Sequence, residues 1–293
     1  MLFQAEFAKD LLVRAVLMED SVMMAASKGR GEKMRSQHRD VVYGPVSSWR
    51  LGRSLGVDPI CQERKVCSFD CIYCSLGATE EKTVERRVFV PARQVARALK
   101  DALGKVEADV VTFSGTGEPT LAQNLGELIE VARETSGLPV AVLTNSSLKI
   151  RKDVREDLAK ADIVKGKLDA SNEELLLAVN RPHAEISFED VVSGLKKFRA
   201  EFRGKFQLEV MFVPENMAFS QEIAKIVRSI NPDEVQINTP LRPSQVRPLT
   251  SQELEIVQRS FSGMNLRSVY RSEKPLVEKS IGEHKIRRLK RSD

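Results

Sequence analysis

One strand–helix unit is visible in residues 108–137, ADVVTFSGTGEPTLAQNLGELIEVARETSG. It begins with a short apolar run around Val110, which is typical of a buried strand. After a glycine-containing turn, apolar residues recur at helical spacing, at Leu121, Leu125, Leu128 and Ala132. Gly137 then supplies a common helix C-terminus. The segment therefore predicts a strand, a turn and a helix in that order.

The same alternation continues on both sides of this unit. Short apolar runs predict strands around Val110, Val140, Ile163, Leu208 and Val235, with a sixth in residues 53–60. Helical patterns occur at residues 91–104, 121–136, 151–160, 172–179, 187–203, 221–230 and 251–261. This alternation indicates an α/β fold of βαβ units with parallel strands, either a partial (βα)6 TIM-like barrel or an open sheet. In both, ligands gather at the C-terminal ends of the strands.

The pattern of apolar and charged residues changes twice along the chain, which predicts three regions. Residues 1–40 are expected to form an N-terminal helical extension and basic linker, with an amphipathic helix at residues 3–18. Residues 41–245 contain the alternating units and are expected to form the partial barrel. Residues 246–293 are expected to add a C-terminal helix and a basic tail.

Composition narrows the class of protein. The chain has 293 residues, 42% hydrophobic and 30% charged, which is typical of a globular protein rather than a disordered one. No apolar run approaches the roughly 20 residues that a membrane-spanning helix needs. Four cysteines do not make a disulfide framework in a chain this long, and no secretory signal is visible, so we expect a reducing cytoplasm. The net charge of +5 suits an anionic partner such as nucleic acid, although a solvated basic surface explains it equally well.

Three of the four cysteines lie in CSFDCIYC, residues 67–74, with the spacing C-x3-C-x2-C. Such close spacing lets several thiolates converge on one cofactor. A closed structural zinc site takes four ligands, and a 4Fe–4S cluster has four iron corners. Cys67, Cys71 and Cys74 would leave one iron open, where a second molecule can bind.

Cys61 keeps an alternative open. It lies six residues before Cys67 and would complete the set as C-x5-C-x3-C-x2-C. The site would then be a closed zinc or Fe–S centre, and the chain a non-enzymatic nucleic-acid-binding protein. The two hypotheses differ on whether Cys61→Ala destroys the site.

The cysteine motif, with Tyr73 just before its last cysteine, resembles that of the radical S-adenosylmethionine (SAM) enzymes. The resemblance implies that Cys67, Cys71 and Cys74 hold a 4Fe–4S cluster whose open iron is chelated by SAM. It also implies reductive cleavage of SAM to a 5′-deoxyadenosyl radical, which abstracts hydrogen from a substrate, and a (βα)6 partial barrel. No flavodoxin-like domain is recognisable, so we expect an external electron donor of the ferredoxin or flavodoxin type.

A second motif agrees with this resemblance. SGTGEPT, residues 114–120, looks like the glycine-rich element that holds the SAM amino group in that superfamily. Gly117 and Glu118 match it, while Thr116 replaces one glycine and Gly115 stands one position earlier. Glycines let the backbone approach a ligand, and a carboxylate pairs with an ammonium group.

Further polar residues end the predicted strands or the helix that follows. In the resemblance they would meet the ribose or carboxylate of SAM: Asn145, Ser146, Lys167, Asp169 and Arg181. Helix capping or solvation of strand ends explains such residues as well. Gln236, Asn238 and Arg242 are candidates for facing the substrate.

Several segments between Tyr43 and Arg242 resemble one group within the superfamily. This group comprises the Fe–S oxidoreductases related to the wyosine-base tRNA enzyme, 4-demethylwyosine synthase, and the matching segments are YGPVSSWRLGRSLGVDPI, FSGTGEPTL, KLDA, NRPH and VQINT. The tRNA enzyme carries extra upstream cysteines for a second cluster, whereas residues 1–60 here contain none. This difference argues against a second cysteine-rich cluster.

The substrate predicted from this resemblance is RNA, in particular tRNA. Basic residues that would contact phosphates occur in two segments. They are Lys28, Arg30, Lys33, Arg35 and Arg39 near the N-terminus, and Lys285, Arg287, Arg288, Lys290 and Arg291 near the C-terminus. A protein or a small molecule is the competing prediction for the substrate. The sequence does not indicate an oligomeric state.

Overall fold

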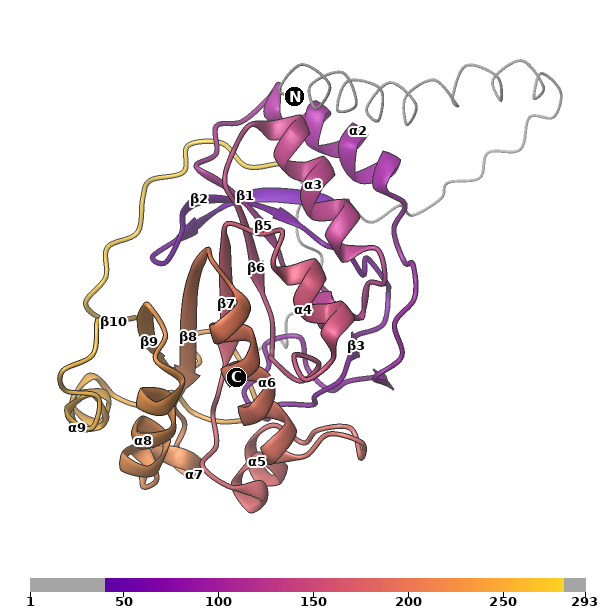
Figure 1. The fold of residues 1–293 in the computed structure, drawn as a ribbon. Coiled ribbons are helices and arrows are strands. Elements are labelled where there is room, and N and C mark those ends of the chain that lie inside the picture. Colours follow the sequence, from indigo (N-terminus) through magenta and orange to yellow (C-terminus); the bar gives the residue numbers. More distant parts are fainter. Residues whose placement is uncertain (1–39, 282–293) are drawn as a thin grey trace, which may run out of the picture.

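The structure is a computed structural model that describes residues 40–281. Its centre is one sheet of eight strands in the order β1-β2-β5-β6-β7-β8-β9-β10, curled into a partial barrel (Figure 1). The predicted N-terminal helix, the basic linker and the basic tail lie outside the described residues.

The six predicted strands are all present. They are β2 (Gly52–Val57), β5 (Val110–Phe113), β6 (Val140–Leu143), β7 (Ile163–Lys167), β8 (Lys205–Met211) and β9 (Glu234–Asn238). All neighbouring pairs among them are parallel, as the alternation with helices requires. The α/β partial-barrel prediction is confirmed.

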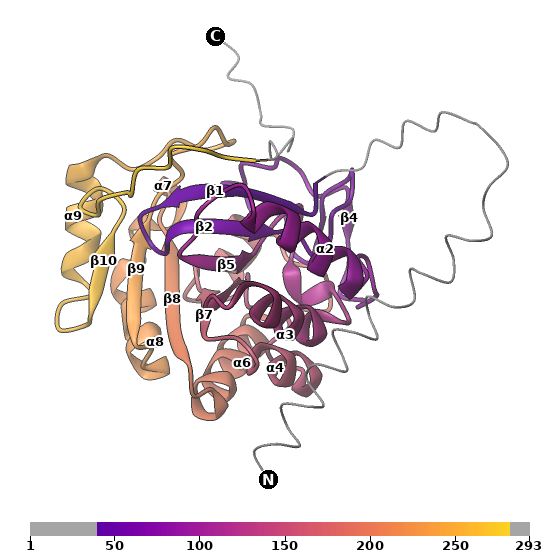
Figure 2. The same ribbon diagram turned by 90° about the horizontal axis from the view of Figure 1, so that it is seen from above.

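Helices cover the outer face of the curled sheet (Figure 2). They are α2 (Ala92–Leu103), α3 (Leu125–Ser136), α4 (Lys152–Leu158), α5 (Glu173–Val179), α6 (Phe188–Glu201), α7 (Pro214–Met217), α8 (Ser220–Ile230) and α9 (Ser251–Arg259). The helix predicted from Leu121 starts later, because residues 119–121 form a separate 3-10 turn. At its other end Gly137 adopts the left-handed conformation, φ 65°, as a helix-ending glycine does.

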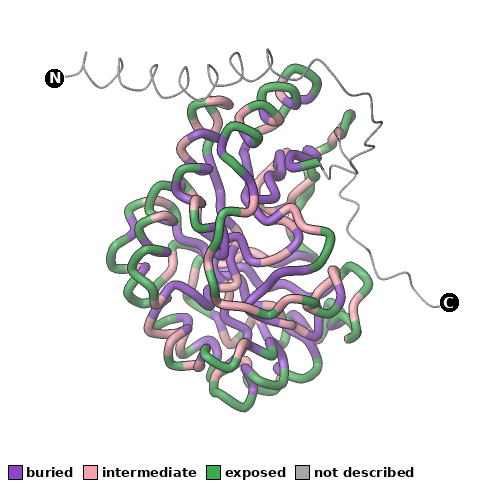
Figure 3. The backbone as a smooth tube through the Cα atoms, turned by 90° about the vertical axis from the view of Figure 1, so that its right-hand side faces the viewer, coloured by how far each residue is buried: buried purple, intermediate pink, exposed green. Residues whose placement is uncertain are grey.

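Strand β8 shows how the two faces of the sheet differ. Phe206 and Leu208 are fully buried toward the helices, and the Phe206 ring packs edge-on against Phe198 of α6 at 5.4 Å. Because strand side chains alternate, Gln207 and Glu209 point to the opposite, concave face. Figure 3 shows the buried residues following the strands through the middle of the molecule. The outer face is therefore an apolar core, whereas this part of the concave face is polar.

Two strands extend the sheet beyond the prediction. Strand β1 (Val42–Ser48) forms an antiparallel hairpin with β2, and β10 (Leu266–Ser268) pairs in parallel with β9. Residues on both sides of the predicted boundary at 245 thus contribute to one sheet. The segment after β10 returns to β1, where the Ile281 N–H donates to the Gly44 carbonyl at 2.6 Å (Figure 1). This return places the end of the described chain beside its beginning.

Candidate active site

The three clustered cysteines lie on a long loop after β2 that crosses the C-terminal ends of the strands. Cys67 belongs to β3 (Val66–Cys67), which pairs with β4 (Glu81–Lys82) in a small second sheet. The loop is also fastened to the end of α5, because Ile72 N–H donates to the Val179 carbonyl at 3.0 Å. All four cysteines are free thiols, with Cys67 buried and the others partly exposed.

A buried lysine places positive charge beside the clustered thiols. Burial raises the pKa of the Cys67 thiol to about 12, although Lys65 opposes this shift. Lys65 is itself 7% exposed and donates to the Gly77 carbonyl at 2.9 Å. Burial alone would lower the pKa of Lys65, but the negative charge of Cys74, Cys67 and Cys71 raises it. Buried thiols of this kind become thiolates when a metal centre replaces their protons, so the donor set fits an iron–sulfur cluster.

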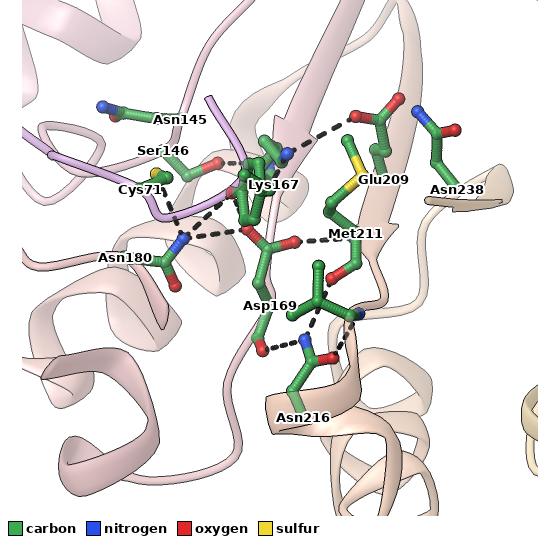
Figure 4. Close-up of polar contacts among 12 residues, drawn as sticks. Cys71, Asn145, Ser146, Lys167, Asp169, Asn180, Glu209, Met211, Asn216 and Asn238 are labelled. Carbon is green, nitrogen blue, oxygen red and sulfur yellow. Dashed lines mark hydrogen bonds and ion pairs between the residues drawn. The ribbon is translucent and has the colours of Figure 1, made fainter. Parts of the chain in front are cut away.

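Two asparagine amides face the cysteine sulfurs. Asn180 Nδ2 lies 3.4 Å from Cys71 Sγ, and Asn145 Nδ2 lies 3.6 Å from Cys67 Sγ. Figure 4 shows Asn180 between Cys71 and Asp169. Neither amide carries charge, so both solvate the sulfurs as dipoles. Asn145 was predicted as a site residue; Asn180 was not, although it directly precedes the predicted Arg181.

The glycines of the SGTGEP turn pack against the cysteine loop. A Cβ built on Gly117 would lie 1.6 Å from the Val66 carbonyl oxygen, and one built on Gly115 would lie 2.1 Å from the Asp58 carboxyl carbon. The sequence predicts that these glycines bring the backbone to a ligand. In the structure they bring it to Val66 and to Asp58, and Val66 directly precedes Cys67.

Asp58 fixes the start of the same loop. Its Oδ1 accepts hydrogen bonds from the N–H groups of Ile60 and Cys61 at 3.0 and 2.9 Å, and its Oδ2 accepts one from Thr116 N–H at 3.0 Å. Cys61 adopts a left-handed conformation there, φ 43°. The carboxylate thus ties the loop to the SGTGEP turn. Within residues 40–281, no three His, Cys, Asp or Glu side chains are placed to hold a single metal ion.

Glu118 is 2% exposed and its carboxylate links the turn after β5 to the end of β6. Oε1 accepts hydrogen bonds from Thr120 and from the Thr144 hydroxyl, the latter at 2.6 Å. Oε2 accepts one from the Asn145 N–H at 2.7 Å. Because a carboxylate oxygen has two lone pairs, Oε2 retains capacity for one further donor.

The predicted residues at the ends of β6 and β7 also come together. Ser146 adopts φ 73°, and its hydroxyl accepts a hydrogen bond from the Lys167 N–H at 2.8 Å. Lys167 Nζ lies 4.3 Å from the centre of the Tyr73 ring and 3.8 Å from Asp169 Oδ2. Tyr73 donates a short hydrogen bond to Asp169. Arg181, by contrast, has an exposed side chain on the loop after α5.

A cavity of about 470 Å³ lies beside the cysteine loop and the SGTGEP turn, on the concave side of the sheet. Ser75, which follows Cys74, and Gly115 of the SGTGEP turn line it together with Leu143 at the end of β6. Arg50 from the β1–β2 turn and Arg242 from the loop after β9 also line it. The cavity therefore connects the cysteine loop to the polar interior of the barrel, and we call it the chamber.

Glu209 is surrounded by cations beside the chamber. Its carboxylate lies 2.8 Å from Arg50 Nη1, 2.7 Å from Lys165 Nζ and 3.6 Å from Lys167 Nζ. Burial would raise the pKa of Glu209, but these cations hold it well below its usual range. Burial and the charge of Arg50 lower the pKa of Lys165 to about 7. Three basic side chains thus surround Glu209, and one of them, Lys167, also faces the Asp169 carboxylate.

Comparisons with known proteins agree with this site. Residues 65–230 match the family model of the radical SAM superfamily. A UPF0026 protein of Synechocystis sp. is 42% identical over 207 residues, 70% of this chain and 77% of that one. A UPF0026 protein of Methanocaldococcus jannaschii is 34% identical over 232 residues, 77% of this chain and 71% of that one.

Solved structures share the fold at low identity. SuiB of Streptococcus suis has been solved with S-adenosylmethionine and with its precursor peptide SuiA, at TM-scores of 0.54 and 0.56 and 17% identity. These matches cover 70% and 74% of this chain, and the chain spans only about half of SuiB, 48% and 49%. A radical SAM methyltransferase of Sphaerobacter thermophilus matches at a TM-score of 0.55 and 14% identity, over 73% of this chain and 65% of that one.

The chain belongs to the radical SAM superfamily. It is a radical SAM enzyme whose cofactors are a 4Fe–4S cluster and SAM, and these cofactors together supply a 5′-deoxyadenosyl radical once an external donor provides an electron. The expected superfamily, fold and cofactors are thus confirmed. The two relatives carry the designation UPF0026 rather than the name of the wyosine-base enzyme. Among the described helices, none is both long and apolar enough to cross a membrane.

Proposed function

We propose that Cys67, Cys71 and Cys74 hold the cluster and that hydrogen abstraction takes place at the adjoining end of the chamber. One observation carries this proposal: Ser75, next to Cys74, and Gly115 of the SGTGEP turn line the same cavity. A molecule in the chamber would therefore lie beside both the cysteine loop and the predicted SAM-binding turn.

The predicted SAM-contacting residues divide by exposure. Asn145 and Lys167 are partly exposed and Arg181 is exposed, so we propose that they reach SAM directly. Glu118, Ser146 and Asp169 are buried and their oxygens accept hydrogen bonds within the protein, so we propose that they orient these neighbours from behind. We propose that Glu118 also receives the SAM amino group, through the remaining capacity of its Oε2. Gly115, Gly117 and Tyr73 shape the surrounding turn and loop.

We propose RNA, in particular tRNA, as the substrate. The described residues that line the chamber include Arg50 and Arg242 but no aspartate or glutamate, which supports an anionic substrate. Its volume of about 470 Å³ is that of a small-molecule site, so a single flipped-out nucleotide would enter rather than a folded RNA. The proposal includes a family relationship between this chain and the wyosine-base tRNA enzymes.

Two competing proposals remain open to test. A peptide or small molecule would also fit a chamber of this size, and the similarity to SuiB, which was solved with a precursor peptide, favours testing a peptide. A closed four-cysteine centre would require Cys61, whose backbone Asp58 holds in place. These alternatives predict different responses to RNA and to loss of Cys61.

The test is release of 5′-deoxyadenosine. The protein is reconstituted anaerobically with iron and sulfide, then given SAM, a strong reductant or a ferredoxin- or flavodoxin-type donor, and either bulk tRNA or the same tRNA after ribonuclease digestion. We expect release that requires Cys71, survives Cys61→Ala and rises only with intact tRNA. Release indifferent to RNA would contradict the RNA proposal, and loss of the cluster in Cys61→Ala would favour the closed centre.

A further inference from the structure

Asn180 occupies the position after α5, is 2% exposed, and places its amide against the cysteine loop. Nδ2 lies 3.4 Å from Cys71 Sγ, 3.0 Å from Tyr73 Oη and 2.9 Å from Asp169 Oδ2 (Figure 4). The backbone reinforces the contact, because Asp70 N–H donates to the Asn180 carbonyl at 2.9 Å. Residues 109 positions apart in the sequence are thus held in direct contact.

The orientation of the Asn180 amide is fixed by the Asp169 carboxylate. A carboxylate only accepts hydrogen bonds, so the nitrogen of the amide, not its oxygen, must face Asp169. Asp169 is held in turn, because its Oδ1 accepts from the Met211 N–H at 2.7 Å and its carbonyl accepts from Asn216 Nδ2 at 2.8 Å. The ends of β7 and β8 and helix α7 therefore keep the amide nitrogen toward Cys71. Of its two N–H groups, one serves Asp169 and the other is shared between Cys71 and Tyr73.

A second amide repeats this arrangement at Cys67. Asn145 Nδ2 lies 3.6 Å from Cys67 Sγ and 2.9 Å from Ser68 Oγ, and Glu118 holds the Asn145 backbone. Each of these two cysteines therefore faces an asparagine that a buried carboxylate holds in place. The longer distance makes the contact at Cys67 the weaker of the two.

We propose that Asn180, assisted by Asn145, is a positioning residue that raises the reduction potential of the cluster. The inference rests on the proposed ligand set of Cys67, Cys71 and Cys74. The positive end of an N–H dipole lowers the energy of the more negatively charged, reduced cluster, and hydrogen bonds to sulfur are among the factors that set such potentials. Asn180 therefore makes it easier for the cluster to accept the electron that starts the reaction.

The test is a spectroelectrochemical titration of the reconstituted full chain, without SAM or substrate. Asn180→Leu keeps the size of the side chain and removes the donor. We expect the equilibrium constant for one-electron reduction to fall about tenfold, which corresponds to about 59 mV toward lower potential. The matched control is Asn172→Ala, which removes the N-cap hydrogen bond to Leu175 N–H on the same helix but touches no sulfur. Its potential should equal that of the wild type.

The outcomes are separable. An unchanged potential in Asn180→Leu with full iron content would overturn the inference and leave the proposed function intact. If Asn180→Leu does not hold the cluster, Asn145→Ala becomes the deciding variant. We expect its reduction potential to shift in the same direction by a smaller amount. An unshifted potential in Asn145→Ala would overturn the inference. A wild-type protein without a 4Fe–4S cluster would overturn the proposed function, and the inference with it.

Discussion

Glu118 accepts a hydrogen bond from the backbone N–H of Asn145 at 2.7 Å, which joins the turn after β5 to the end of β6. The Thr144 hydroxyl donates to the other carboxylate oxygen at 2.6 Å. One buried side chain thus fixes two neighbouring strand ends at the point where the cysteine loop crosses them. Glu118 is an organiser of this edge as well as a predicted SAM contact.

Glu118→Gln should weaken both the fold and SAM binding. In Glu118→Gln, an NH2 group replaces one of the two oxygens that now accept hydrogen bonds. At least one buried N–H therefore loses its acceptor. We expect a loss of about 1–3 kcal/mol in the free energy of unfolding. Denaturant titration measures this loss, and equilibrium dialysis of SAM with the reconstituted protein measures binding. Unchanged stability together with unchanged SAM affinity would contradict the organising role.

Gly117→Ala should displace the cysteine loop. The new Cβ would lie 1.6 Å from the Val66 carbonyl oxygen, so the backbone before Cys67 has to move. We expect reconstitution to incorporate much less iron and sulfide, measured by chemical analysis of the purified protein.

The matched control for this change is Gly104→Ala. Gly104 has φ −70°, and an added Cβ would have its nearest neighbours at 3.9 Å. This variant should keep its iron and be neutral or up to about 1 kcal/mol more stable. Equal iron content in both variants would show that the close approach of Gly117 to Val66 is not needed for the cluster.

Lys149 should make stability depend on pH. It is fully buried, its Nζ has a long hydrogen bond of 3.4 Å to Ser146 Oγ, and burial lowers its pKa to about 7. Between about pH 7 and pH 10 the lysine is neutral in the folded protein and protonated in the unfolded chain, whose ordinary pKa is about 10.4. The unfolded state then binds more protons, so stability rises with pH by about 1.4 kcal/mol per unit from this group.

Lys149→Met removes this dependence. The variant should be more stable than the wild type near pH 7, and the difference should shrink as pH rises toward 10. Chemical denaturation at several pH values measures both slopes. Parallel slopes would mean that Lys149 stays protonated when buried.

The strands and the cysteine motif could be predicted because their signals are local. Apolar runs around Val110 and Val235 depend only on neighbouring residues, and so does the spacing of Cys67, Cys71 and Cys74. Strand β10 has only three residues and gains its partner from β9, so its own sequence carries little signal. The role of Asn180 depends on folding that brings it to Cys71, and a single asparagine at a helix end predicts only capping.

The polar interior of the barrel was harder to predict from the sequence, for a different reason. Alternation along β8 is visible once the strand is placed, yet the sequence does not show that Glu209 meets Arg50 of the β1–β2 hairpin, 159 residues away. The chamber is therefore a product of the curled sheet, which brings distant strands to one concave face. Its lining residues were predicted only in part, through Gly115 and Arg242.

Arg242→Gln should weaken RNA binding if the chamber receives a nucleotide. Arg242 is exposed on the loop after β9 and lines the chamber, so loss of its charge removes one phosphate contact at the entrance. We expect weaker binding of bulk tRNA and a slope of log affinity against log salt that is smaller by about one. Arg93→Gln is the control, because Arg93 is exposed on α2, away from the chamber lining, and should leave the slope unchanged. Equal slopes in the two variants would show that RNA does not approach the chamber past Arg242, and a peptide or small-molecule substrate would then be favoured.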